Sequence, residues 1–307
     1  MSRISIEKRL PKYHKIYEQI YEDPSIPLYQ IMKNTGISRS TVSRYLIEMY
    51  GLSILKGPLI FVKPAQNYHQ YAAFLKFEHP LRAYQGFKGF PSLYSRSVLV
   101  GAWNIMVVCE KFMNFSSLKG FRDCLLHEAK GVTYVPKVAS FDWDTSLEKM
   151  YSSLFHPRGK SSLYHEIPHN HWEKEEWTLA TRFKHNIRTH AMPILKESGI
   201  RFEKYQKWFS SLRAYAHMYT AFYPYGLDQY FVFDFLFRTE HQKQLVDILG
   251  MLPSSSLFFS VDSYLLARLS LLNKKEKDEL FSFILDLGEE GYFTDFHCAS
   301  VVSTSYL

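Results

Sequence analysis

The second half of this sequence repeats the first, and the repeat limits the possible folds more than any other feature. A shift of 163 residues aligns residues 32–49 with residues 195–212 without a gap, so that Lys-Asn-Thr-Gly-Ile falls on Lys-Glu-Ser-Gly-Ile. Further along, residues 90–92 match residues 252–254. Self-similarity of this kind indicates duplication of a structural unit. We therefore expect two copies of one unit in a single chain.

Each copy is predicted to begin with a helix-turn-helix. In the first copy, apolar residues recur at helical spacing in residues 13–22, 28–34 and 38–50. Gly36 permits the tight turn between the last two helices, and Ser38 is a good N-cap. Residues 54–62, with a turn at residues 56–58, predict a short two-stranded wing. This order is typical of a winged helix-turn-helix.

One face of the helix predicted over residues 38–50 carries hydroxyls and guanidinium groups without a carboxylate. Such side chains reach phosphates and base edges when a helix enters the major groove, although an ordinary solvated helix face is the simpler interpretation. On the wing, two lysines are placed to touch backbone phosphates. The candidate DNA contacts are Ser38, Arg39, Ser40, Thr41, Ser43, Arg44, Lys56 and Lys63. The second copy has Arg201, Glu203, Lys204 and Lys207 on this face and is expected to pack or to support phosphate contacts.

After each helix-turn-helix, the pattern predicts the order βαββαβ of a ferredoxin-like domain. The predicted strands are 71–77, 93–100, 103–109 and 132–141, then 230–237, 257–261, 264–271 and 292–302. The predicted helices are 80–90 and 115–129, then 242–251 and 275–287. The fold class is therefore α+β, with two copies of a winged helix-turn-helix followed by a ferredoxin-like domain. The expected domains are 1–66, 67–143, 173–229 and 230–307, with a linker at 144–172.

Charge is distributed unevenly along the chain, which has a net charge of +7. Residues 1–66 contain ten Lys and Arg against five Asp and Glu, whereas residues 230–307 contain six against eleven. This asymmetry favours a polyanion as partner of the front end. No apolar run is long enough to span a membrane, the N-terminus lacks the apolar core of a signal peptide, and three cysteines have no metal-like spacing. We expect a cytoplasmic protein.

These features together resemble the Lrp/AsnC (feast/famine) family. The matching features are the Gly-Ile-Ser-x-Ser-Thr-Val-x-Arg segment at 36–44, the Phe-Pro at 90–91, the Val-Gly turn at 100–101 and the Gly-Val at 131–132. The resemblance implies a sequence-specific, double-stranded-DNA-binding transcription regulator that forms a homodimer or higher homo-oligomer. It also implies a small-molecule effector between paired ferredoxin-like domains. The family turn Gly-x-x-Asp ends in Asn here, and the candidate ligand residues are Gly101, Trp103, Asn104, Asp262 and Tyr264.

Other functions leave weaker patterns in the sequence. His165 and His169 satisfy the H-E-x-x-H pattern of zinc proteases, but Pro168 between them disfavours the helix that this chemistry needs. We expect no catalytic residue, metal or cofactor. The alternative is a tetrapyrrole-modifying enzyme, since siroheme decarboxylases also look like Lrp/AsnC proteins, although their characteristic pocket motifs are not found here. A ligand-binding or assembly protein without DNA contact is a third possibility.

Overall fold

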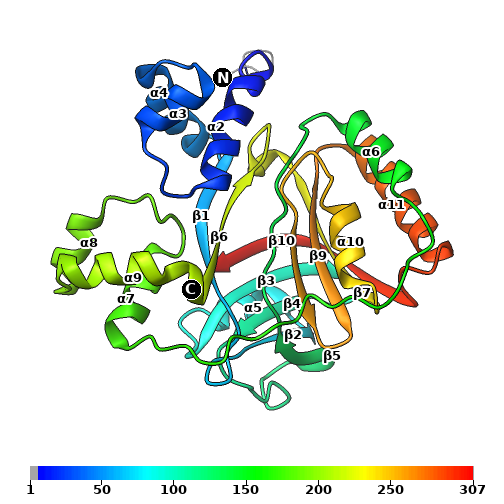
Figure 1. Cartoon of the computed structure of the whole chain (residues 1–307). Helices are drawn as coiled ribbons and strands as arrows, with labels where there is room; N and C mark the ends of the chain where they lie inside the picture. The colour runs from blue at the N-terminus through cyan, green and yellow to red at the C-terminus, as the bar shows by residue number, and fades with distance from the viewer. Residues whose placement is uncertain (1–5, 307) are drawn as a thin grey trace.

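The computed structural model describes residues 6–306. Residues 1–5 lie outside this range. They belong to the N-terminal segment for which the sequence predicts no signal peptide. The fold is a mixed α/β arrangement in which two small helical units sit against one strand-rich body (Figure 1). No helix within residues 6–306 is both long and apolar enough to cross a membrane.

The first helical unit consists of α2 (Leu10–Glu22), α3 (Leu28–Thr35) and α4 (Arg39–Gly51), close to the predicted bounds. Gly36 makes the turn at φ +70°, a left-handed conformation that glycine adopts without strain. Ser38 caps α4 by accepting a hydrogen bond from the Thr41 backbone N–H at 3.3 Å. The apolar faces of the three helices bury a core that includes Tyr13, Ile16 and Val42.

The second helical unit has the same order of elements, with α7 (Lys174–Phe183), α8 (Ala191–Ser198) and α9 (Phe202–Tyr215). Gly199 makes the corresponding turn at φ +68°, nearly the value of Gly36. Its core is separate and more aromatic, and it includes Phe183 and Trp208. Arg201 stands where Ser38 stands in the first unit, and its side chain makes no capping hydrogen bond.

The predicted two-stranded wing is wrong. Residues 55–62 form one continuous strand, β1 (Leu55–Val62), which pairs antiparallel with β6 (Ala216–Phe222) directly after the second helical unit. The expected turn at Gly57 is a register shift within β1, and a Cβ on Gly57 would lie 2.9 Å from the Tyr219 carbonyl oxygen. The two helical units therefore share a single β-ribbon, which crosses the middle of the molecule (Figure 1).

Eight strands close into a barrel in the order β10-β3-β4-β2-β5-β8-β9-β7. The first half contributes β2 (Gln70–Phe77), β3 (Leu93–Gly101), β4 (Ile105–Cys109) and β5 (Phe121–Lys130). The second contributes β7 (Phe231–Arg238), β8 (Leu257–Val261), β9 (Tyr264–Leu271) and β10 (Asp295–Tyr306). Each set of four strands has the same internal order, with its first strand between its third and fourth.

The two barrel halves differ in their helices. The second half runs β7, α10 (Gln242–Leu249), β8, β9, α11 (Lys274–Glu289), β10, as predicted, whereas the first half has α5 (Pro80–Gly86) but no second helix. The helix predicted over 115–129 is wrong, because Gly120 adopts φ +81° and β5 begins at the next residue. Two register shifts between β2 and β5 disturb the alternation that would have signalled this strand.

The strand predicted over residues 132–141 is also wrong, because this segment leaves the sheet after one bridge between Tyr134 and Phe258. Its backbone groups are satisfied by side chains of α2 instead. The Tyr21 hydroxyl donates to the Val135 carbonyl at 2.8 Å, and the Val138 N–H donates to the Tyr17 hydroxyl at 2.8 Å. The segment thus ties the barrel to the first helical unit, and α6 (Trp143–Ser152) follows it within the predicted linker.

The barrel is closed by two unequal seams. Strands β10 and β3 pair along seven residue positions, whereas β5 and β8 pair at one position, Lys130 with Val261. Apolar residues from both halves fill the interior, among them Phe74, Trp103, Leu236, Phe259 and Leu266.

Candidate functional site

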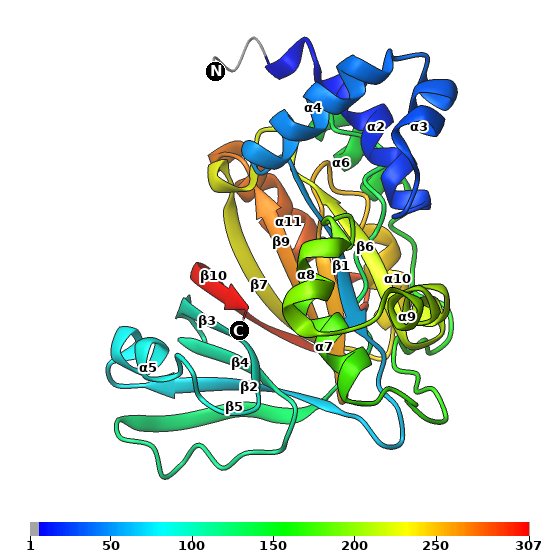
Figure 2. The same ribbon diagram turned by 90° about the vertical axis from the view of Figure 1, so that its left-hand side faces the viewer.

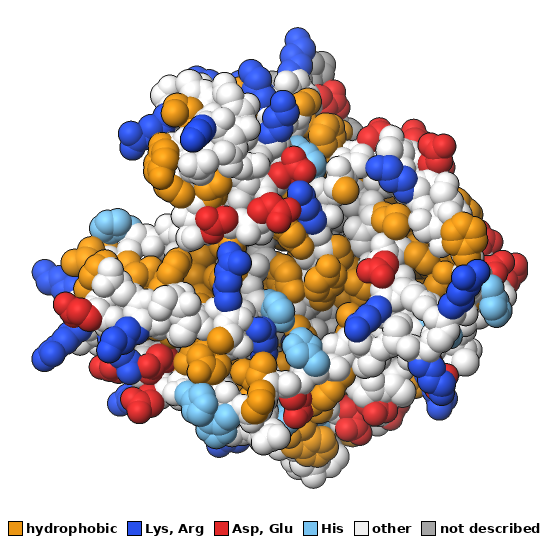
Figure 3. All heavy atoms as spheres, in the orientation of Figure 1, with side chains coloured by type: hydrophobic (Ala, Val, Ile, Leu, Met, Phe, Trp, Pro, Cys, Tyr) orange, Lys and Arg blue, Asp and Glu red, His pale blue; other side chains and the backbone are white. Residues whose placement is uncertain are grey.

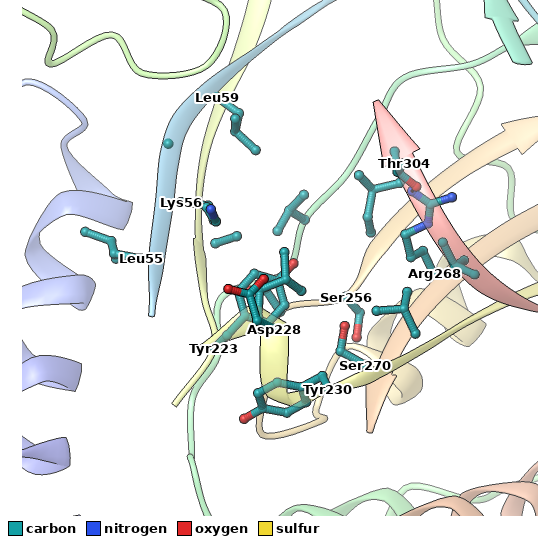
Figure 4. Close-up of a pocket in the computed structure, with 18 of the residues that line it drawn as sticks. Leu55, Lys56, Leu59, Tyr223, Asp228, Tyr230, Ser256, Arg268, Ser270 and Thr304 are labelled. Atoms are coloured by element: carbon teal, nitrogen blue, oxygen red, sulfur yellow. The ribbon is translucent and has the colours of Figure 1, made fainter. Parts of the chain in front are cut away.

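A cavity of about 700 Å³ lies between the β1–β6 ribbon and the second half of the barrel. Figure 3 shows apolar side chains gathered in the hollow at the centre of the molecule, and Figure 4 shows the residues that converge on the cavity. Both halves of the chain contribute to its wall. The residues that the following paragraphs use are Tyr50, Lys56, Gly57, Leu59, His185, Tyr230, Ser255, Ser256, Leu257, Arg268 and Thr304.

A buried ion pair forms the floor of the cavity. Arg268 on β9 donates from Nε and Nη2 to the two carboxylate oxygens of Asp234 on β7, at 2.7 and 2.8 Å. Asp234 is fully buried, so only a paired and hydrogen-bonded arrangement makes its charge tolerable there. Arg268 also donates to Thr304 on β10 at 3.2 Å and to Ser97 on β3 at 3.3 Å. The network therefore crosses the long seam and joins the two barrel halves.

Hydroxyl groups from the segment before β8 line one side. The Ser255 hydroxyl accepts a hydrogen bond from the Phe222 N–H at 2.7 Å and so fixes the end of β6. Ser256 is 3% exposed, and its Oγ is buried without a hydrogen-bond partner among the described residues. A buried hydroxyl in this state costs free energy unless something bonds to it, so Ser256 is available to a bound molecule.

The roof of the cavity is the start of β1. Lys56 points from β1 toward the space between the ribbon and the barrel (Figure 4). Among residues 6–306, no ion-pair or hydrogen-bond partner is found for its amine. The backbone beside it is held in place, because the Tyr50 hydroxyl donates to the Gly57 carbonyl at 3.0 Å.

Two further groups on the wall can take part in proton transfer. Burial raises the pKa of the Tyr230 phenol, so this group stays protonated and can act as a donor at neutral pH. Desolvation, with a smaller effect of Lys184, lowers the pKa of His185, which is therefore a neutral imidazole at pH 7. With the apolar side chains of Leu59 and Leu257, these groups make a largely apolar site with a few polar anchors.

The structure separates the residues predicted to contact DNA into two groups. Ser38, Arg39, Ser40, Thr41, Ser43 and Arg44 lie together at the start of α4. Three of the hydroxyls bond to one another, with Ser38 Oγ 2.9 Å from Thr41 Oγ1 and 3.2 Å from Ser40 Oγ. Lys63 donates from its amine to the Arg213 carbonyl at 2.8 Å, near the end of α9. Lys56 lines the cavity instead of a wing.

The five predicted effector residues do not line this cavity. Trp103 is fully buried in the barrel, with its ring edge-on to Phe74 at 5.1 Å. Asn104 holds the β3–β4 turn by two hydrogen bonds to the backbone of Phe77, each 2.8 Å long. Gly101 packs directly against β10, and Asp262 and Tyr264 form the β8–β9 turn. All five stabilise turns of the barrel.

The histidine-rich linker does not form the helix that an H-E-x-x-H site requires. Glu166 accepts a hydrogen bond from Tyr164 and lies 2.8 Å from His69 Nε2, and His169 contacts Asn67. Within residues 6–306, no group of three or more His, Cys, Asp or Glu side chains is arranged to hold a metal ion.

Sequence reasoning did not find the cavity. Arg268, Tyr230 and Ser256 belong to no motif, and they come together only because the ribbon folds over the barrel mouth. The clearest sequence signal for the cavity is the presence of single charged residues within the apolar strands β7 and β9. Asp234 and Arg268 stand among apolar residues in strands predicted to be buried, and a buried strand tolerates such charges when they face each other.

No protein-family model and no curated protein matches this sequence. Among solved structures, the siroheme decarboxylase NirDL is similar to this chain, with 11% sequence identity and a TM-score of 0.49, covering 95% of this chain and 91% of that one. NirDL in co-complex with an iron-uroporphyrin III analogue is similar at 10% identity, with the same TM-score and coverage.

These findings correct the prediction of a DNA-binding transcription regulator that is not an enzyme. The similar structures are those of an enzyme, and neither is a regulator. The molecule itself lacks the predicted wing, and one of the two wing lysines is bonded within the fold while the other faces the cavity. The part of the prediction that stands is the mixed α/β fold.

Proposed function

We propose that this chain is an enzyme that acts on a large ring compound with several carboxylates, of the tetrapyrrole class, bound in the central cavity. The observation that carries this proposal is the make-up of the wall. Leucines from β1 and β8 line a space of about 700 Å³ together with a lysine, a phenol and a buried hydroxyl. Small-molecule sites enclose about 300–1,000 Å³, and large ligands need the upper part of that range.

The apolar side chains of the cavity match the ring of such a compound, and the cationic side chain matches its carboxylates. The side chains of Leu59 and Leu257 offer a surface to the ring, and the Lys56 amine offers a charge-assisted hydrogen bond to a carboxylate. A bound compound also supplies a hydrogen-bond partner to the buried Ser256 hydroxyl. Siroheme, named in the enzyme that resembles this fold, and the iron-uroporphyrin III analogue of its co-complex are compounds of this class.

Removal of a carboxyl group is the reaction that the site supports best. The bond between the carboxylate and its neighbouring carbon breaks, carbon dioxide leaves, and the electron pair that remains on carbon takes up a proton. A leucine-lined wall strips water from the carboxylate, which favours its loss. The Tyr230 phenol, protonated at neutral pH, is the proton donor, and Lys56 holds a second carboxylate and so orients the ring.

A second proposal concerns the domain architecture of the chain. We propose that the chain is a duplicated unit of helix-turn-helix and ferredoxin-like domain, in which the two copies pair within one molecule. The sequence repeat, the matching turns at Gly36 and Gly199, and the shared strand order of the two barrel halves support this proposal. The cavity then lies between the two copies.

The test is a titration with iron-uroporphyrin III followed by absorbance, and then incubation with siroheme followed by mass spectrometry. Wild-type protein should bind the porphyrin and release product lighter by the mass of carbon dioxide. Lys56→Met should weaken binding roughly tenfold or more, the effect of one hydrogen bond to a charge. Tyr230→Phe should keep binding and lose turnover.

The matched control is Lys88→Met, which removes an exposed lysine outside the cavity. It should bind and react like wild type. Failure of the wild-type protein to bind either compound would reject the proposal, as would equal weakening by Lys56→Met and Lys88→Met.

A further inference from the structure

A second hollow, of about 440 Å³, opens beside α5 on the outer face of the first barrel half. Its floor is aromatic. The ring of Phe87 lies edge-on to Phe77 at 6.0 Å and to Phe90 at 5.6 Å, and Leu118 closes one side. Phe77 and Phe87 are only 4% and 2% exposed, so the floor is fixed by the core beneath it.

The hollow exists because the first half lacks the second helix. In the second half, α11 lies next to α10 and buries Phe283, Ile284 and Leu287 completely. In the first half, a loop over residues 110–120 takes that place, and α5 lies alone at one end of the sheet (Figure 2). The loop is anchored at its end, since the Glu78 N–H donates to the Gly120 carbonyl at 2.8 Å.

Two cations stand at the rim of this hollow. Arg82 on α5 and Lys119 on the loop are both exposed and line it, and no ion-pair partner of either is found among residues 6–306. The acidic residue at the rim, Glu78, is compensated by Arg122 at 3.1 Å. The rim is therefore positive, above a floor of phenylalanine rings.

We propose that this hollow binds an amphipathic organic anion, with an aliphatic chain or a single aromatic ring on the floor and a carboxylate at Arg82 and Lys119. Its volume lies in the range of small-molecule sites, and a carboxylate between two cations forms charge-assisted hydrogen bonds. A small ligand fits better than a partner helix, because the loop already covers much of the face that α11 covers in the other half. Phe115 in that loop is 4% exposed. The hollow shares no residue with the central cavity.

Isothermal titration calorimetry with decanoate tests this site on the full chain. Wild-type protein should bind one decanoate, and the double variant Arg82→Glu/Lys119→Glu should bind it at least tenfold more weakly. The matched control, Lys76→Glu/Lys88→Glu, reverses two exposed charges in the same barrel half that do not line the hollow. It should bind like wild type. Lys56→Met should also bind decanoate normally, which separates this site from the proposed enzyme cavity.

Three results would overturn the proposal. The first is no binding of decanoate by the wild-type protein. The second is equal loss in both double variants, which would indicate unspecific attraction by charge. The third is a concentration-dependent dimer, seen by light scattering, that decanoate does not affect and Arg82→Glu/Lys119→Glu abolishes, which would make the hollow a contact between two copies.

Discussion

The two barrel halves of this chain have the same order of strands and treat buried charge in opposite ways. In the second barrel half, Asp234 and Arg268 form a bidentate pair inside the barrel. In the first half, the side chain of Lys130 is also buried, but its amine donates to neutral groups, the Gly131 carbonyl at 3.1 Å and the Thr133 hydroxyl at 2.7 Å. Burial lowers the pKa of Lys130 to about 7.

The two buried charges also differ in their position relative to the cavities of the molecule. The paired charges sit at the floor of a large cavity, where they fix the position of polar groups without adding net charge. Lys130 sits at the single position where β5 meets β8, and it lines neither the central cavity nor the hollow beside α5. The two barrel halves share one strand order, and the bidentate Asp234–Arg268 pair lies in the second half.

The largest effect is expected from breaking the charge pair. Asp234→Ala leaves the Arg268 guanidinium in the barrel without its counter-charge, and the free energy of unfolding should fall by about 3–5 kcal/mol. Urea denaturation measures this change. The control Asp295→Ala removes an exposed carboxylate on the adjacent strand and should change stability by less than about 0.5 kcal/mol.

A second variant sharpens this prediction. Asp234→Leu/Arg268→Met replaces both charges with apolar groups and should recover most of the lost stability, because no charge remains unpaired. If the double variant is as unstable as Asp234→Ala, the cost arises from packing and not from the charge of Arg268.

The next effect concerns Lys130 and depends on pH. Its pKa is about 7 in the folded protein and near 10.5 in the unfolded chain, so the unfolded chain holds more protons between these values. The free energy of unfolding should therefore rise as pH increases from 7 toward 9, and it should be lowest below pH 7. Lys130→Met should remove this slope and stabilise the protein at pH 6 by roughly a few kcal/mol.

Denaturation at pH 6, 7.5 and 9 checks this prediction. Lys76→Met, an exposed lysine on β2, is the control and should keep the wild-type slope. A slope that survives in Lys130→Met would assign the pH dependence to other groups.

The smallest effect compares the two helical units. Ser38 caps α4, whereas Arg201 at the same place in α9 has no capping hydrogen bond. Ser38→Ala should cost about 1 kcal/mol, and Arg201→Ser should gain up to about 1 kcal/mol. Thermal unfolding of both variants measures the two changes, and equal losses would show that the second turn does not have the geometry of the first.

The sequence predicts those parts of the fold that depend on local pattern. The helices around Gly36, the strands at 257–261 and 264–271, and α11 begin and end within a few residues of their predicted bounds. These segments combine a clear period with a turn or a cap. The helix expected over 115–129 failed because Gly120 and two bulges interrupt the period there.

The site could not be predicted in the same way. Strand β1 finds its partner β6 more than 150 residues later, and no local signal distinguishes that pairing from a hairpin. The ribbon forms the roof of the cavity. Without knowledge of the pairing of β1 with β6, the sequence places Lys56 on a DNA-binding wing and gives Arg268 no role. The family resemblance directed attention to the turns at 101–104 and 262–264, which hold the barrel together at a distance from the cavity.

The pairing of β1 with β6 also has a consequence for synthesis of the chain on the ribosome. When the first half has emerged, β1 and β3 still present open edges, because their partners β6 and β10 belong to the second half. β10 is the last of the eight barrel strands in chain order, so the barrel cannot close until this strand has been made. Contacts this distant in sequence form slowly, and open edges can pair with other chains. A nascent chain of this kind needs protection until β10 has left the ribosomal tunnel.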